Sequence, residues 1–154
     1  AASRGSPENI QTLLAAGADV MARTKTGRTP LHYAAVSNTT ASIQILLTAG
    51  ADAMARGGNG WTPLHWASSG GSYLNIETLL AAGANVMARG GDDWTPLHWA
   101  ASSGTSDNIE VLLAAGADAK AKSKDGKTPW DLAQENEEAE GTKGYWALND
   151  AQYN

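Results

Sequence analysis

Three histidines lie 33 residues apart, at His32, His65 and His98, and the chain has no others. Imidazole nitrogen is a common zinc ligand, so a set of three histidines suggests a metal site. A single zinc ion, however, holds its ligands at about 2 Å, whereas packed elements that repeat along a chain lie roughly 10 Å apart. The even spacing therefore favours three separate structural histidines over one shared metal centre.

Hydroxyl and carboxylate side chains also occur in pairs, but without the surroundings that catalysis needs. The serine pairs at 68–69 and 102–103 lack the Gly-x-Ser-x-Gly turn of a hydrolase nucleophile. The acidic pairs at 92–93 and 137–138 are predicted in a turn and at a helix end, whereas acid–base catalysis needs a cleft that shifts pKa values. The glycine-rich run at 57–60 lacks the Lys-Ser/Thr of a phosphate loop. The sequence predicts no enzyme, no cofactor and no metal.

Two short phrases recur with one period of 33 residues and indicate how the chain is built. Thr-Pro-Leu-His starts at Thr29, Thr62 and Thr95 and becomes Thr-Pro-Trp-Asp at Thr128, while Ala-Gly-Ala-Asp or Ala-Gly-Ala-Asn starts at Ala16, Ala49, Ala82 and Ala115. Two unrelated motifs that recur with the same period indicate stacked copies of one supersecondary unit. Such arrays present extended surfaces, and stability is nearly a sum over units and their interfaces.

Within one repeat the helix-capping and helix-ending residues predict two helices. Thr62 and Pro63 suit the cap and first turn of a short helix. A longer helix is expected from Tyr73 to about residue 82, with Gly83 as its left-handed stop. Ser6 before Pro7 and Ser106 before Asp107 predict the same start for two other long helices, and the leucine pairs at 46–47 and 112–113 are expected in the core.

These residues place the chain in a family context. The phrase Thr-Pro-Leu-His-x-Ala at 29–34, 62–67 and 95–100, with its period of 33, resembles the signature of the ankyrin repeat family, and of free-standing bacterial-type arrays in particular. The resemblance implies an all-α repeat solenoid of stacked helix–turn–helix units, with β-hairpin fingers projecting at about a right angle. It also implies that each histidine ring hydrogen-bonds the backbone of a finger turn.

The same register predicts one domain, 1–154, divided into a truncated first repeat at 1–27, full repeats at 28–60, 61–93 and 94–126, and a C-terminal capping repeat at 127–154. The alignment of residues 1–2 with 34–35 predicts that the chain begins partway through a repeat. An open apolar helix face is therefore expected at Ile10, Leu13 and Leu14, where self-association or an upstream repeat would cover it. The apolar face of the cap is expected at Tyr145, Trp146 and Leu148.

Charge and composition narrow the classes of partner. Residues 1–124 carry nine acidic and nine basic side chains, so the net charge of −5 comes from residues 125–154 and suggests a solubilising end segment. This balance argues against binding to nucleic acid or to an anionic membrane. No apolar run is long enough to span a bilayer. The absence of cysteine fits a reducing compartment such as the cytoplasm, but it would suit an exported protein equally well.

The aromatic residues differ from copy to copy of the 33-residue repeat, and they are the candidate binding residues. Trp61 and Trp94 precede Thr-Pro, while Trp66 and Trp99 follow Leu-His, where Tyr33 stands in the preceding copy. The resemblance implies that these positions line a concave face on which partner contacts cluster. Because tryptophan is enriched at binding hot spots, partner binding is favoured for the first two residues. Packing is favoured for Trp66 and Trp99, which replace a semi-buried leucine.

Basic residues form a second ladder on the fingers. Arg23, Arg56 and Arg89 share one position, and Arg28 stands at the position of Trp61 and Trp94. Two interpretations remain open: a solubilising rim that pairs with nearby aspartates, or an interface of arginine beside tryptophan. The fold and these residues together predict a protein-binding module. The alternatives are a small-ligand or glycan reader that uses the tryptophan ladder, and a self-assembling structural protein.

Overall fold

The computed structural model describes residues 6–37, 39–137 and 139–153. Outside this description lie residues 1–5, with the start of the predicted first repeat, and residues 38, 138 and 154. One carboxylate of the predicted pair at 137–138 is therefore also outside it.

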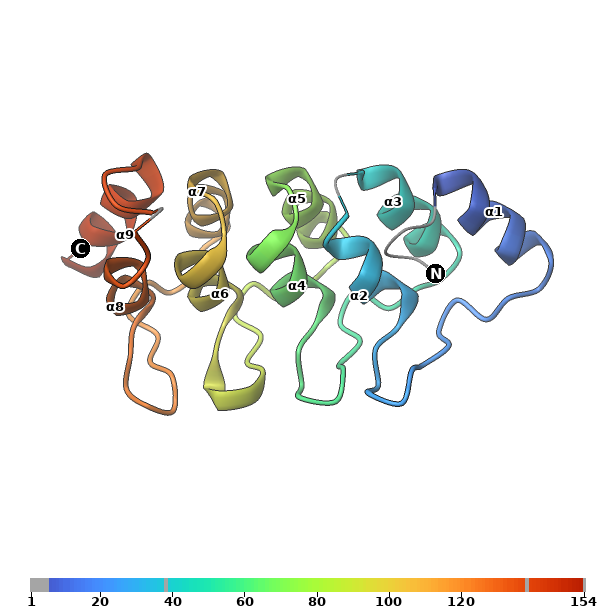
Figure 1. Ribbon diagram of the computed structural model, residues 1–154, viewed down its shortest axis with the longest axis horizontal. Helices are drawn as coiled ribbons and strands as arrows, with labels where there is room; N and C mark the ends of the chain where they lie inside the picture. Colours follow the sequence, from blue (N-terminus) through green and yellow to red (C-terminus); the bar gives the residue numbers. More distant parts are fainter. Residues whose placement is uncertain (1–5, 38, 138, 154) are drawn as a thin grey trace.

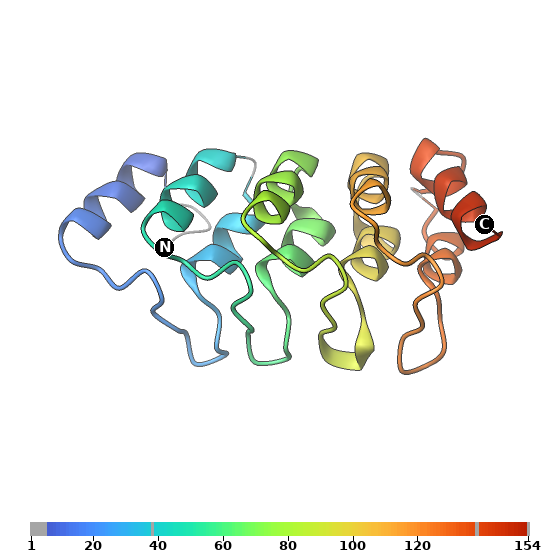
Figure 2. The ribbon, with the colours of Figure 1, turned by 180° about the vertical axis from the view of Figure 1, so that it is seen from behind.

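Helices follow one another in two rows, and loops project from one side of both rows (Figures 1 and 2). The elements are α1 (Pro7–Ala15), α2 (Pro30–Ala35), α3 (Thr40–Thr48), α4 (Pro63–Gly70), α5 (Tyr73–Ala81), η1 (Gly91–Asp93), α6 (Pro96–Ser103), α7 (Ser106–Ala114), α8 (Pro129–Gln134) and α9 (Lys143–Tyr153). The short helices α2, α4, α6 and α8 contact one another in sequence, as do the longer α1, α3, α5, α7 and α9. This arrangement confirms the predicted helical repeat solenoid.

The helices begin and end at the predicted capping and stop residues. Thr62 has an extended backbone before Pro63, and α4 begins at that proline. The predicted long helix is α5, and Gly83 just beyond it has φ of +87°, a conformation that glycine adopts without strain. Ser6 caps α1 as expected, because its hydroxyl accepts the N–H of Asn9 at 3.4 Å.

One predicted cap is wrong by a residue. Ser106 is the first residue of α7, and Thr105 is its cap, with its hydroxyl accepting the N–H of Asn108 at 3.3 Å. The hydroxyl of Ser106 instead accepts the N–H of Gly144, at 2.7 Å. The neighbouring threonine therefore caps the helix, while the serine bonds α9 to α7.

The core is a row of equivalent side chains from successive repeats. Its fully buried members include Leu31, Leu64 and Leu97 from the short helices and Ile43, Ile76 and Ile109 from the long ones. In the predicted leucine pairs, Leu46 and Leu112 are buried, whereas Leu47 and Leu113 are half-buried against the edge of this core. Each repeat thus covers part of the apolar face of its neighbour, as a stacked array requires.

Four loops connect the long helices to the following short helices, at 16–29, 49–62, 82–95 and 115–128, and are called fingers 1 to 4 below. The expectation of β-hairpins is wrong, since no strand is present among the described residues. Finger 2 is closed by one bond, from Gly57 N–H to Trp61 O at 2.9 Å. The next hydrogen-bonded pair of a hairpin would join residues 55 and 63, but the Ala55 N–H donates to Asp52 O and Pro63 has no N–H.

The two ends differ from expectation in single residues. Ile10 is 5% exposed because it belongs to the core against α3, so the predicted open face is limited to Leu13, which is 50% exposed, and the half-buried Leu14. On α9, Leu148 is buried and Tyr145 half-buried, but Trp146 is 55% exposed and does not belong to the apolar face. Within the described residues, no helix combines the length and apolar character that crossing a bilayer requires.

Candidate functional site

Five half-buried aromatic side chains lie along the fingers and the short helices, and they are called the aromatic row below: Tyr33, Trp61, Trp66, Trp94 and Trp99. Trp99 on α6 joins two fingers, because its ring centroid lies 5.2 Å from that of Trp61 and 5.2 Å from that of Trp94. Tyr33 and Trp66 form a second group, with centroids 6.3 Å apart. The structure therefore brings the predicted aromatic residues together, across three consecutive repeats.

Trp61 both packs and remains partly open to solvent. A Cβ atom built on Gly90 of finger 3 would lie 2.1 Å from Cε3 of the Trp61 ring. The indole of finger 2 therefore rests on the bare backbone of finger 3, which glycine alone allows at this distance. This contact fixes the ring in place, so that its solvent-facing part is presented in one orientation.

Arg28 contributes a charge to the aromatic row. Its guanidinium carbon lies 4.3 Å from the centroid of the Trp66 ring, within the range of a cation–π contact. Arg28 is half-buried, so the ring holds its charge beside the exposed aromatic surface. The predicted pairing of arginine with tryptophan is therefore present at this position.

The three arginines of the ladder, Arg23, Arg56 and Arg89, each contact the neighbouring finger. Arg23 Nη1 donates to Arg56 O at 2.8 Å, Arg56 Nη2 to Arg89 O at 2.7 Å, and Arg89 Nη1 to Lys122 O at 2.9 Å. Each side chain thus reaches the backbone of the equivalent position one repeat later. These contacts give the arginine ladder a structural role in stacking the fingers, which neither sequence interpretation included.

Replacing Arg89 with alanine is expected to lower the midpoint of thermal unfolding by about 3 °C. The variant loses two bonds from Nη1, to Lys122 O and to Asp93 O at 3.1 Å. Differential scanning calorimetry would measure the shift, and Lys25→Ala, which removes an exposed cation from finger 1, is the matched control. An equal shift in both variants would show that loss of positive charge, and not loss of the finger contact, is responsible.

Each histidine uses both ring nitrogens within the fold. Nδ1 accepts the backbone N–H of the preceding threonine, so Nε2 carries the proton and donates to a carbonyl of the next finger. The three Nε2–O distances are 2.9 Å from His32 to Trp61, 3.1 Å from His65 to Trp94 and 3.1 Å from His98 to Lys127. This geometry confirms the predicted structural role.

Protonation of these rings is disfavoured in the fold. Burial lowers the pKa of His65 to about 4, and the hydrogen bond to the Trp94 carbonyl only partly opposes this. Burial likewise lowers the pKa of His32 and of His98. A proton on Nδ1 would also face the threonine N–H that this nitrogen now accepts.

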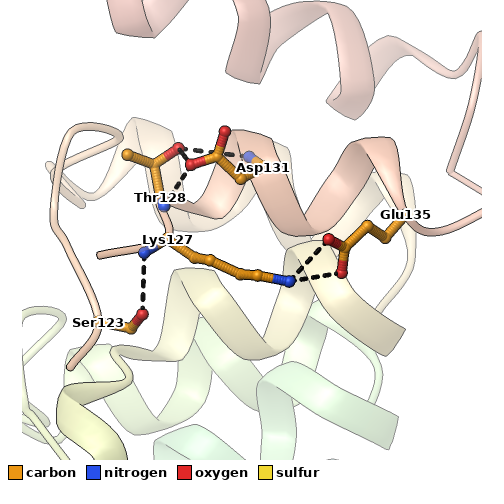
Figure 3. Close-up of polar contacts among 5 residues, drawn as sticks. All are labelled: Ser123, Lys127, Thr128, Asp131 and Glu135. Carbon is orange, nitrogen blue, oxygen red and sulfur yellow. Dashed lines mark hydrogen bonds and ion pairs between the residues drawn. The ribbon is translucent and has the colours of Figure 1, made fainter. Parts of the chain in front are cut away.

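The fourth repeat closes the site with charged residues (Figure 3). Asp131 replaces the histidine, and its Oδ2 accepts the N–H and the hydroxyl of Thr128 at 2.7 and 2.8 Å, which lowers the pKa of this carboxyl. Lys127 stands where Trp94 stands one repeat earlier, and its ammonium contacts both carboxylate oxygens of Glu135 at 2.7 and 2.9 Å. The aromatic row therefore ends at an ion pair.

The residues set aside as catalytic candidates have local roles or lie in solvent. Ser68 Oγ donates to Leu64 O at 2.7 Å, and Ser69 Oγ donates to Trp66 O at 3.2 Å. Asp92 and Asp93 are exposed in η1 and have φ of +58° and +59°.

Sequence reasoning missed two buried asparagines. Asn75 and Asn108 are fully buried at the start of the long helices, and each donates through Nδ2 to backbone carbonyls of the preceding repeat. Asn75 reaches Ala35 O at 3.0 Å, and Asn108 reaches Gly71 O at 3.1 Å. Their separation of 33 residues was a signal that could have identified them.

Paired helices in two stacked rows, joined by projecting fingers, define a helical repeat protein with an extended lateral surface. Family models described as ankyrin repeats match residues 1–90 (3 copies) and residues 79–133 (many copies). The chain belongs to the ankyrin repeat family. A search of curated proteins found no significant match. Ankyrin repeats are generally protein–protein interaction modules and are typically not enzymes.

Proposed function

We propose that this protein binds a protein partner on the finger–helix face, the surface formed by the fingers and the short helices that carries the aromatic row. The observation that supports the proposal is the row itself: five partly exposed rings in contact within two groups, over three repeats. Tryptophan, tyrosine and arginine are the residue types most enriched at protein-binding hot spots.

The packing of the row favours binding without rearrangement. Trp61 is fixed over Gly90, and Trp99 is fixed between Trp61 and Trp94. Rings that are already ordered lose little side-chain entropy when a partner covers them, so more of the contact energy appears as affinity. Arg28, held on Trp66, adds a charge that suits a carboxylate or a carbonyl group of the partner.

Ring orientation favours a protein surface over a flat glycan or small ring. Trp99 meets Trp61 at an interplanar angle of 81° and Trp94 at 66°, so the three indoles are arranged edge to face. This arrangement presents an uneven apolar relief in place of the parallel platform that a sugar face requires. An irregular protein surface can complement such a relief along the length of the array.

Replacing both Trp61 and Trp94 with alanine is expected to weaken partner binding about 1,000-fold, because two anchors of about 2 kcal/mol each are lost. Partners would first be selected with the immobilised intact chain, and affinities would then be measured by calorimetry. Trp146→Ala is the matched control, since it removes an exposed tryptophan from α9, at the far end of the array.

Circular dichroism would establish that the double variant keeps its helices. The midpoint of its thermal unfolding would show whether loss of the two rings also weakens the packing of the fingers. Unchanged affinity in a folded double variant would reject the assignment to the finger–helix face. A loss of affinity in Trp146→Ala as large as in the double variant would place the contact at the C-terminal cap.

A further inference from the structure

All three methionines of the chain stand at one position of the repeat, Met21, Met54 and Met87, and each contacts the next finger through sulfur. Met21 Sδ accepts the backbone N–H of Asp52 at 3.4 Å, Met54 Sδ that of Asn85 at 3.0 Å, and Met87 Sδ that of Asp118 at 3.2 Å. Every methionine therefore makes the same inter-repeat bond, 31 residues along the chain in each case.

The residues whose N–H groups donate to sulfur also accept hydrogen bonds through their side chains, which extends these bonds into a relay. Oδ1 of Asp52 accepts the N–H of Met54, and Oδ1 of Asn85 accepts the N–H of Met87, both at 2.8 Å. Hydrogen bonds to sulfur between fingers thus alternate with hydrogen bonds to side-chain oxygens inside each finger. The series, called the methionine relay below, starts at Asp19 and ends where Oδ1 of Asp118 accepts the N–H of Lys120.

The methionines of the relay are all partly exposed to solvent. Met54 is 37% exposed, and Met21 and Met87 are half-buried. A thioether sulfur carries two lone pairs, and the amide N–H occupies one of them. The other can therefore attack an electrophile while the finger contact is still in place.

We propose that the methionine relay is a modification site for hydroperoxides, at which each thioether is oxidised to the sulfoxide in the folded protein and the fingers are thereby uncoupled. The sulfur lone pair attacks one peroxide oxygen, so that an S–O bond forms while the O–O bond breaks. The attacked oxygen releases its proton, and the departing oxygen takes up a proton and leaves as water or an alcohol. Sulfur is oxidised by two electrons, and the peroxide is reduced by two.

Oxidation changes the contact through geometry and polarity. If the new oxygen points to solvent, sulfur loses the electron density that accepted the amide N–H. If the oxygen points to the amide, sulfur must retreat by the length of an S–O bond from a donor that now lies 3.0 Å away in the Met54–Asn85 pair. In both cases the polar sulfoxide disturbs the stacking of one finger on the next.

Hydrogen peroxide treatment of the intact chain, followed by peptide mass spectrometry and amide hydrogen exchange, tests the proposal. We expect all three methionines to gain one oxygen, with Met54 reacting fastest because it is the most exposed. The amides of Asp52, Asn85 and Asp118 should then exchange about threefold faster or more. Reduction by methionine sulfoxide reductases should restore the original exchange rates.

Met54→Leu provides the matched control, because leucine fills a similar volume but neither accepts the N–H nor reacts. In this variant the amide of Asn85 should exchange rapidly from the start and should not respond to peroxide, while those of Asp52 and Asp118 still respond. Complete oxidation without faster exchange at the three amides would overturn the proposal. So would an oxidation rate that equals the rate of global unfolding and does not depend on peroxide concentration.

Discussion

Alanine at position 71 is expected to destabilise the protein by about 3 kcal/mol, the upper range for overpacking at a close contact. A Cβ on Gly71 would lie 2.4 Å from Ala35 O and 2.9 Å from Ala67 O, the backbones of two successive short helices. Neither carbonyl belongs to a flexible side chain that could move aside. The repeats would have to separate, which loosens the stack that buries Leu31 and Leu64. Urea unfolding would measure the loss.

The neighbouring glycine supplies the control for this substitution. Gly70 ends α4, and a Cβ there would meet no heavy atom within 4 Å. Gly70→Ala is therefore expected to be neutral, or to stabilise by up to about 1 kcal/mol through helix propensity. Similar losses in both variants would mean that backbone freedom at this turn matters, and that the close approach of the helices does not.

Acidification from pH 7 is expected to weaken the fold through the three histidines. Their pKa values are lowered in the fold, so below pH 6.5 the unfolded chain binds more protons at these residues than the folded chain does. The free energy of unfolding therefore falls as the pH falls. For His65, with a folded pKa of about 4, the contribution is complete above pH 6.5 and decreases by about 3 kcal/mol on approaching pH 4.

Urea unfolding at half-unit steps between pH 7 and pH 4.5 would record this slope. His65→Gln is the matched variant, because an amide oxygen can accept the Thr62 N–H and an amide N–H can donate to Trp94 O without titrating. The free energy of unfolding of this variant should change less with pH, by the contribution of one titrating group. Asp131 does not produce the slope, since its pKa is lowered from 3.8 and it stays ionised over this range. A parallel profile in the variant would contradict the assignment to His65.

Much of the helical scaffold could be predicted because its determinants are local. Pro63 begins α4 and Gly83 follows α5, since a proline ring and a positive φ are properties of single residues. The fingers could not be predicted in the same way. In finger 2 the Ala55 N–H, which a further hairpin rung would use, donates to Asp52 O instead, and the repeated sequence does not express this competition.

The candidate site was predictable in residue type but not in contact. The sequence selected Trp61 as a binding residue, yet its seat on Gly90 depends on how far one finger overlaps the next. The sequence position of Arg56 is compatible with a solubilising rim and with a binding interface, and its bond to Arg89 O belongs to neither. The methionines also recur every 33 residues, but this spacing does not indicate which N–H group of the next finger donates to each sulfur.

The bonds between fingers also bear on how such a chain can change its length. Arg56 reaches Arg89 O, His65 reaches Trp94 O and Met54 receives the Asn85 N–H, each bond pairing a residue with the corresponding unit one repeat on. A duplicated copy of residues 61–93 would meet ready-made acceptors and donors on both of its sides. Duplication or deletion of whole units thus requires no compensating substitution, and the aromatic surface lengthens or shortens with the number of copies.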